Sequence, residues 1–343
     1  MVLKRFGGRV RRIALVLSAA VLGGCAGGES PDGAAQGGGS FVSPLQLHKP
    51  VVIADEGDCY FAPENTMVAI RNGDRQGADV LEVDMNITSD GELVVIHDGM
   101  LDRTTDCTGA VNSHTLAEVR ACDAAFWWVP GTAPGIGGLV TDPTRDPNDG
   151  QDYAMRGKGV QVPTVREFFQ YAVDHHLPLI AAEIKNIPYD SNFDPQGHAI
   201  ADVLVPLIHE YGLTHRIIIE SFWPTSLRRV KELDPEIVTS FLTLGSATEN
   251  YAYVAASNTD HSSSDILPPD FNQLYVNNVH ALGKLAMPWA VDAPADFQRM
   301  VTLGADGAYT CHTTCMLQTL GRPTPQQVVT PEAGISYDVP ACQ

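Results

Sequence analysis

Short apolar runs that alternate with helical patterns limit most strongly what this chain can fold into. Eight such runs follow one another, at residues 51–54, 80–87, 93–96, 179–184, 217–222, 237–244, 287–291 and 307–310. Most of the segments between them carry the apolar spacing of helices, at residues 63–76, 164–175, 197–211, 225–233 and 293–303. Strands that alternate with helices pair in parallel. The sequence therefore predicts an α/β fold, a TIM-type (β/α)8 barrel, with residues 46–343 as a single domain.

One link in this pattern is too short for an ordinary barrel crossover. Residues 85–92 join the second apolar run to the third, whereas a parallel crossover with a helix needs a dozen or more residues. We therefore expect a helix-free return or a distortion at this place. Two polar stretches, 129–161 and 245–270, are predicted to be inserted loops, either functional lids or disordered segments.

The N-terminus has the features of an export signal. Lys and Arg residues within positions 4–12 precede an apolar stretch, 13–22, that is too short to span a bilayer. It runs into Leu22-Gly-Gly-Cys25, which resembles a bacterial lipobox, where a peptidase cuts before a cysteine that then carries lipid. An ordinary secretory signal with a chance cysteine is the alternative. We predict a signal peptide at 1–24, lipidation at Cys25 and a flexible tether up to residue 45, with the exported domain held on the periplasmic or extracellular side of a membrane by its lipid anchor.

The charge of the chain excludes one class of partner. Asp and Glu number 41 against 22 Lys and Arg, which gives a formal net charge of −19. A chain this acidic is unsuited to binding nucleic acid by neutralising phosphates, and equally unsuited to binding an anionic bilayer by charge alone. Small-molecule chemistry and metal binding stay open, and the sequence leaves the oligomeric state undetermined.

Six cysteines remain after the lipidation site, at positions 59, 107, 122, 311, 315 and 342. An even number in an exported protein favours disulfides, although six cysteines allow fifteen pairings. Cys107 and Cys122 would close a short loop and are the pair that we predict. A metal site at Cys311-His312-Thr313-Thr314-Cys315 is the alternative for this segment, but it offers only three soft ligands.

Two carboxylates lie on one face of a predicted strand. In Glu82-Val-Asp84 the acids are two residues apart, and side chains of a strand repeat every two residues. Buried like charges need a proton or a cation between them, and a divalent ion with oxygen ligands meets that need; two solvated acids on a polar face are the alternative. Glu183 and His97 come toward the ends of other predicted strands, where barrel enzymes place catalytic groups.

These residues belong to motifs that occur together in one family. In chain order the sequence contains Ala62-Pro-Glu-Asn-Thr66, Gly77-Ala-Asp79, Glu82-Val-Asp84, Thr88-Ser-Asp-Gly91, Val94-Val-Ile-His-Asp98, Leu101-Asp-Arg-Thr-Thr105 and Glu183-Ile-Lys185. Over about residues 50–310 this series resembles the glycerophosphodiester phosphodiesterase family. The resemblance implies a TIM-type barrel of the phospholipase-C-like kind and metal-dependent hydrolysis of small phosphodiesters, such as glycerophosphocholine, to glycerol 3-phosphate and an alcohol.

The resemblance also implies a role for individual residues. Glu82, Asp84 and Glu183 would hold a divalent metal, Ca²⁺ or Mg²⁺. His97 would be a catalytic acid or base. Lys185 would bind the phosphate, and Trp289 lies where the family often lines the substrate pocket.

The chain departs from the family at the end of the first strand. The family has His-Arg-Gly there, with a second proton-transfer histidine and an arginine on the phosphate, and this chain has Asp55-Glu56-Gly57. Asp55 is therefore the second candidate for proton transfer, and Glu56 occupies the substrate-binding position of the arginine. Three readings stay open: a phosphodiesterase with altered catalytic groups, a catalytically impaired relative that binds a metal, ligand or partner, and an enzyme for a less anionic substrate.

Overall fold

A computed structural model of the chain describes residues 47, 49–129, 153–188, 190–243, 254, 259–264, 271–331, 334–339 and 342. All of them belong to one compact unit, Phe41–Gln343. The predicted signal segment 1–24, Cys25 and the tether up to residue 45 lie outside the described residues, as do most of the predicted insertions 129–161 and 245–270. None of the described helices combines the length and the apolar character that crossing a bilayer requires.

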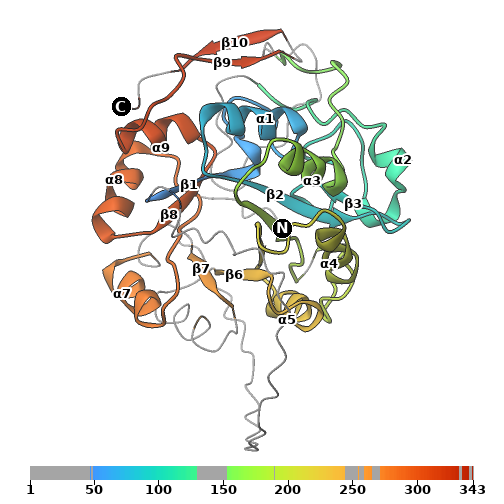
Figure 1. The fold of residues 1–343 in the computed structure, drawn as a ribbon. Coiled ribbons are helices and arrows are strands. Elements are labelled where there is room, and N and C mark those ends of the chain that lie inside the picture. Colours follow the sequence, from blue (N-terminus) through green and yellow to red (C-terminus); the bar gives the residue numbers. More distant parts are fainter. Residues whose placement is uncertain are drawn as a thin grey trace, which may run out of the picture. The chain divides into compact units, whose positions relative to one another are not determined.

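The centre of the fold is a curled sheet of parallel strands (Figure 1). From one edge to the other its parallel strands are β7 (His261–Ser264), β6 (Val238–Thr243), β5 (Ile217–Ser221), β4 (Ile180–Ile184), β2 (Val80–Ile87), β1 (Val51–Ala54) and β8 (Gly307–Thr310). Every neighbouring pair in this order is parallel. In the described residues the sheet is open between β7 and β8, so the fold is TIM-barrel-like without the closed ring of eight strands that the sequence predicts.

The run at 93–96 forms a strand, but the prediction that this strand belongs to the parallel barrel is wrong. Its strand, β3 (Leu93–Val95), pairs antiparallel with β2, with Met85 opposite Val95. A tight turn joins the two, in which the N–H of Thr88 donates to the carbonyl of Glu92 at 3.0 Å. The link between β2 and β3 is too short for a parallel crossover, so the chain returns as a hairpin. The expectation of a helix-free return is confirmed.

Two further strand assignments differ from the sequence prediction. Residues 287–291 form no extended strand, although the N–H of Val291 donates to the carbonyl of Tyr309 in β8 at 2.8 Å. Pro288 lacks an N–H and limits the ladder at this place. Conversely, β7 lies inside the stretch predicted to be a polar loop. Its residues are polar, so only their pairing with β6 reveals a strand.

Helices follow most of the parallel strands. They are α1 (Met67–Gln76), α2 (Leu116–Val119), α3 (Val165–Asp174), α4 (Ala201–Glu210), α5 (Pro224–Leu233), α7 (Gln273–Ala281), α8 (Pro294–Leu303) and α9 (Thr313–Thr319), with short 3-10 turns η2 (Asp55–Gly57) and η3 (Val111–Ser113). Figure 1 shows α7, α8 and α9 along one side of the sheet, and α3, α4 and α5 along the other. Thr164 caps α3 in a capping box with Glu167, while α5 and α8 begin with proline. A terminal hairpin, β9 (Gln327–Thr330) and β10 (Ile335–Asp338), contacts α1.

Alternate residues of the strands face opposite sides of the sheet. Leu81 and Val83 of β2 pack in a cluster with residues of α3 and α4. Val80 packs instead with Ile53 and Ile218 in a cluster drawn from the strands themselves and the segment before β8, without helix residues. This second cluster is an apolar layer inside the curl. Side chains of the same parity further along each strand therefore point into the interior above it.

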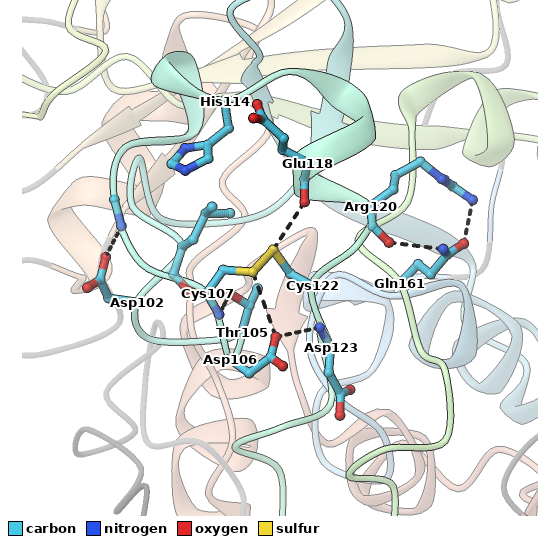
Figure 2. Close-up of a disulfide and its surroundings, with 12 residues drawn as sticks. Asp102, Thr105, Asp106, Cys107, His114, Glu118, Arg120, Cys122, Asp123 and Gln161 are labelled. Atoms are coloured by element: carbon cyan, nitrogen blue, oxygen red, sulfur yellow. Dashed lines mark hydrogen bonds between the residues drawn. A yellow bond between two sulfur atoms is a disulfide. The ribbon is translucent and has the colours of Figure 1, made fainter.

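Three disulfides are present in the described residues. Cys107 and Cys122, the predicted pair, are joined with Cα atoms 5.7 Å apart, and Figure 2 shows Asp106 accepting a hydrogen bond from the N–H of Asp123 beside them. The remaining pairs are Cys59–Cys311 and Cys315–Cys342. Cys311 and Cys315 are thus in disulfides, which removes the alternative of a metal site at these two residues. Cys59–Cys311 connects the segment after β1 to the residue after β8.

Removing the Cys59–Cys311 bond should destabilise the fold more than removing the short-range bond. The two bonds span 252 and 15 residues, respectively. The chain-entropy relation then gives about 5.5 kcal/mol for the Cys59→Ser/Cys311→Ser variant and about 3 kcal/mol for Cys107→Ser/Cys122→Ser. Urea unfolding of the oxidised proteins measures both losses. An unfolding midpoint of the first variant equal to that of the wild type would contradict the expectation.

Candidate active site

One pocket collects all the residues that the sequence assigns to catalysis, substrate binding or metal binding. It contains about 430 Å³ of empty space, part of it open to solvent. Its lining residues are Asp55, Glu56, Glu82, Asp84, His97, Glu183, Lys185, Glu220, Phe222, Leu242, Trp289 and Tyr309. Six of these twelve residues are acids, and Lys185 is the only Lys or Arg among them, so the pocket carries an excess of buried carboxyl groups.

The segment after β1 places Asp55 and Glu56 at the pocket. Glu56 has φ +52°, in the left-handed region, and its N–H donates to Oε2 of Glu82 at 2.9 Å. Gly57 follows with φ +85°, and a Cβ at this position would lie 2.6 Å from the backbone nitrogen of Ile70 in α1. Only glycine allows this close approach of the turn to the helix. The turn therefore places two acids at the pocket through its left-handed backbone and one glycine.

Strand register brings carboxyl groups from three strands side by side. Asp84 of β2 lies opposite Glu183 of β4, which lies opposite Glu220 of β5. Glu82 shares the inward parity of Asp84 on β2. Burial and repulsion from Asp84 raise the pKa of Glu82 well above its usual range, and burial raises the pKa of Glu183 to about 7.

Lys185 is the cation that these acids share. It is 2 % exposed, and its Nζ lies 3.1 Å from Oε2 of Glu183 and 3.4 Å from Oδ1 of Asp84. Burial alone would raise the pKa of Asp84, but Lys185, His97 and a 2.7 Å hydrogen bond from the Asn65 amide lower it below its usual value. Asp84 is therefore ionised, while its carboxyl neighbours retain protons more easily.

His97 is held by a chain of charged groups behind it. Its Nδ1 lies 2.7 Å from Oδ1 of Asp98. Arg103 binds Asp98 through Nε at 2.9 Å, and its other nitrogens bind Glu64 at 2.5 and 2.9 Å. Burial and Lys185 lower the pKa of His97, but Asp84 and Asp98 outweigh them and raise it above its usual value. The imidazole is thus fixed in orientation and takes up a proton more readily than an ordinary histidine does.

Asp55 lies in surroundings suited to proton transfer. Burial, followed by repulsion from Asp84 and Asp292, raises the pKa of Asp55 to about 7. A carboxyl with such a pKa exists in both protonation states at neutral pH, as a general acid or base requires.

Sequence reasoning assigned no role to Glu220 and Tyr309. The Tyr309 hydroxyl of β8 donates to Oε1 of Glu220 across the pocket, and burial raises the pKa of Glu220 well above its usual range. The sequence signal was only that Glu220 is a single acid within the apolar run 217–222. On the apolar wall, Trp289 meets Phe222 edge-to-face at 5.4 Å between ring centres.

The fold and this pocket together define a TIM-barrel-like protein with an acidic site on the inner face of its parallel strands. Comparison with known families specifies the class further. The model of the glycerophosphoryl diester phosphodiesterase family matches residues 57–313. The chain therefore belongs to this family, which confirms the resemblance found in its sequence motifs.

Relatives in sequence agree with the family, and solved structures agree with the fold. A glycerophosphodiester phosphodiesterase of Caldanaerobacter subterraneus subsp. tengcongensis is 32% identical over 76% of this chain and 94% of its own length. One from Bacillus subtilis is 27% identical over 79% of this chain and 86% of its own. Among solved structures, an Oleispira antarctica phosphodiesterase in complex with the product sn-glycerol-3-phosphate matches with a TM-score of 0.62 and 20% identity, over 80% of this chain and 97% of its own. A glycerophosphodiester phosphodiesterase from Agrobacterium tumefaciens matches with a TM-score of 0.56 and 22% identity, over 77% and 97%.

Exchange of Asp98 should lower the pKa of His97. Asp98→Asn keeps the shape of the side chain but removes the negative charge that favours the imidazolium form. An NMR pH titration of the His97 ring in metal-free protein measures the change. Asp234→Asn is the matched control, because Asp234 contacts His209 at 2.8 Å instead, and the pKa of His97 should not change in it. A pKa of His97 that is unchanged in Asp98→Asn would contradict this account.

Proposed function

We propose that this protein hydrolyses glycerophosphodiesters to glycerol 3-phosphate and an alcohol, with Asp55 and His97 transferring protons and Lys185 binding the phosphate. The observation that carries the proposal is the gathering of these three residues with Glu82, Asp84 and Glu183 around one pocket. The relatives named above are glycerophosphodiester phosphodiesterases, and a phosphodiesterase of the same fold binds sn-glycerol-3-phosphate. These findings favour a small phosphodiester substrate.

The donor set fits a hard divalent cation, Ca²⁺ or Mg²⁺. Glu82, Asp84 and Glu183 offer carboxylate oxygens from two adjacent strands, and Oε1 of Glu183 is buried without a hydrogen-bond partner among the described residues. Such a cation supplies charge neutralisation at the phosphoryl oxygens when it is bound. It would also relieve the repulsion that raises the pKa of Glu82.

The protein groups then divide the proton transfers. The reaction needs one group to take a proton from the attacking water and one to give a proton to the leaving alkoxide. His97 and Asp55 line the same pocket; the pKa of Asp55 is raised to about 7, and the pKa of His97 is raised above its usual value by Asp84 and Asp98. Lys185 gives the phosphate a compact positive charge, while Trp289 and Phe222 provide an apolar wall for the carbon atoms of the substrate.

A second candidate function is binding without hydrolysis. The observation that favours it is Glu56, which is 3 % exposed and takes the place of the arginine that binds phosphate in the family motif. An ionised carboxylate at this position repels an anionic substrate. A relative of this kind would bind a metal, a ligand or a partner through the same pocket.

Release of glycerol 3-phosphate from glycerophosphocholine tests the two candidates. We expect turnover with Ca²⁺ or Mg²⁺ that EDTA abolishes and that Glu82→Gln and Lys185→Met each lower by at least about 100-fold, as losses of charge stabilisation do. Asp55→Asn should lower the turnover by about 100-fold through lost proton transfer.

Two further proteins separate the outcomes of this assay. Glu210→Gln is the control, because Glu210 is solvent-exposed and pairs with Arg166; it should keep wild-type turnover. A silent wild type together with an active Asp55→His/Glu56→Arg variant would reject hydrolysis and support the binding function.

We propose further that the protein is an exported lipoprotein, anchored through Cys25 after removal of residues 1–24. The basic and apolar segments that precede Leu22-Gly-Gly-Cys25 support this proposal. In a bacterial host fed a labelled fatty acid, the wild-type chain should take up label and sediment with membranes. Cys25→Ser should do neither, whereas label retained in Cys25→Ser would contradict the proposal.

A further inference from the structure

Glu56 is a buried acid with one carboxylate oxygen that has no hydrogen-bond partner among the described residues. The residue is 3 % exposed, and this oxygen is Oε2. Burial, followed by repulsion from Glu64 and Asp84, raises its pKa well above the usual range. A buried carboxyl in this situation is stabilised either by a proton or by a cation bound to it.

Two other ligand groups lie around Glu56. Glu56, Asp84 and His97 each offer one ligand atom, and the three atoms lie within 4.8 Å of one another. Ligands around one transition-metal ion, with bonds of about 2.0–2.2 Å, lie up to about 4.4 Å apart. The spacing of this triad is therefore close to that of a metal site and needs only small side-chain adjustments.

His97 is already oriented as a metal-binding histidine is. Its Nδ1 is engaged with Asp98 at 2.7 Å, which leaves Nε2 as the nitrogen that can bind a ligand. Metal-bound histidines usually donate their other ring N–H to a carboxylate, which fixes the ring. Asp98 is in turn held by Arg103 at 2.9 Å, so the ring support is in place.

We propose that Glu56, Asp84 and His97 form a second divalent-cation site, distinct from the set Glu82, Asp84 and Glu183. Asp84 belongs to both sets, and a carboxylate can bridge two ions. The nitrogen donor favours a transition metal such as Mn²⁺ or Zn²⁺ over Ca²⁺ or Mg²⁺.

The site also accounts for the acid at position 56. A cation on Glu56 puts positive charge where the family motif has an arginine, and a phosphate can bind there again. This use of the site rests on the proposed phosphodiesterase function, although cation binding does not. While the cation is bound, His97 Nε2 is a ligand and transfers no proton, so in that state Asp55 takes the proton from the attacking water and then gives it to the leaving alkoxide.

The neighbouring groups permit the site. Lys185 contacts Asp84 at 3.4 Å but is nearer to Glu183, and Asn65 donates to Oδ2 of Asp84 at 2.7 Å. Lys185 is the only Lys or Arg among the pocket residues, against six acids. One further divalent cation therefore reduces the charge imbalance.

Mn²⁺ binding to the full chain, purified in detergent and stripped with EDTA, tests the proposal. EPR counts the bound ions. Glu56→Gln should bind one Mn²⁺ fewer than the wild type, or bind it at least about tenfold more weakly, since even groups that only support a ligand contribute that much. Asp58→Asn makes the same chemical change at a buried acid two residues away, which accepts from Gln76, and it should match the wild type.

Pulsed EPR of the wild type gives a second readout, and a variant serves only as its control. Bound Mn²⁺ should show coupling to an imidazole nitrogen, and His97→Gln should lose it. Equal Mn²⁺ counts in the wild type and Glu56→Gln, or bound Mn²⁺ without nitrogen coupling, would overturn the second site. Neither measurement uses a phosphodiester, so an absence of hydrolysis counts against the proposed function alone.

Discussion

The pocket depends on a balance of charge, because six acids line it and Lys185 is the only Lys or Arg among its lining residues. Parallel register sets Asp84, Glu183 and Glu220 next to one another on the inner face of the sheet. Lys185 reaches only the first two of them, and Tyr309 donates a hydrogen bond to the third. Repulsion between buried like charges destabilises the fold. The apolar layer beneath the pocket and the packing of the helices on the outer face of the sheet offset this cost. The pocket is therefore a strained region on a well-packed support, as sites that bind cations commonly are.

Much of this arrangement follows from the sequence, because the period of two along a strand is a local property. The spacing of Glu82 and Asp84 identifies one face of β2, and motif order adds Glu183, Lys185 and His97. Glu220 is a single acid in an apolar run, and nothing local separates it from a partnered core residue. Its importance arises only from its neighbours in the sheet.

The strand assignments that differ from the prediction have a similar cause. The run at 93–96 is as apolar as a barrel strand, and only the length of its link indicates the hairpin that forms. The polar residues of β7 form a strand because β6 provides hydrogen-bond partners, and residues 287–291 lie beside β8 without extending into a strand. In each case the strand or its absence depends on pairing with other strands, so the β-propensity of the residues alone does not predict it.

Main-chain contacts and one glycine hold the turn that carries Asp55 and Glu56. Gly57 permits the close approach to α1, and the N–H of Asn65 donates to the carbonyl of Glu56 at 2.9 Å. Neither contact uses the side chain of Asp55 or Glu56, so side chains at these two positions can change without loss of these main-chain contacts. Function can diverge here without a change of fold.

Cys59–Cys311 gives this turn a dependence on the redox state of its surroundings. The bond fastens the segment that follows Asp55 and Glu56 to the end of β8, where the N–H of Tyr60 also donates to the carbonyl of Cys311 at 3.1 Å. Before the two thiols are oxidised, the segment that carries both acids is held by hydrogen bonds and packing alone. Reduction of this one bond would remove the covalent link between the pocket turn and the end of β8, so a single redox event acts on the stability of the fold and on the anchoring of the site together.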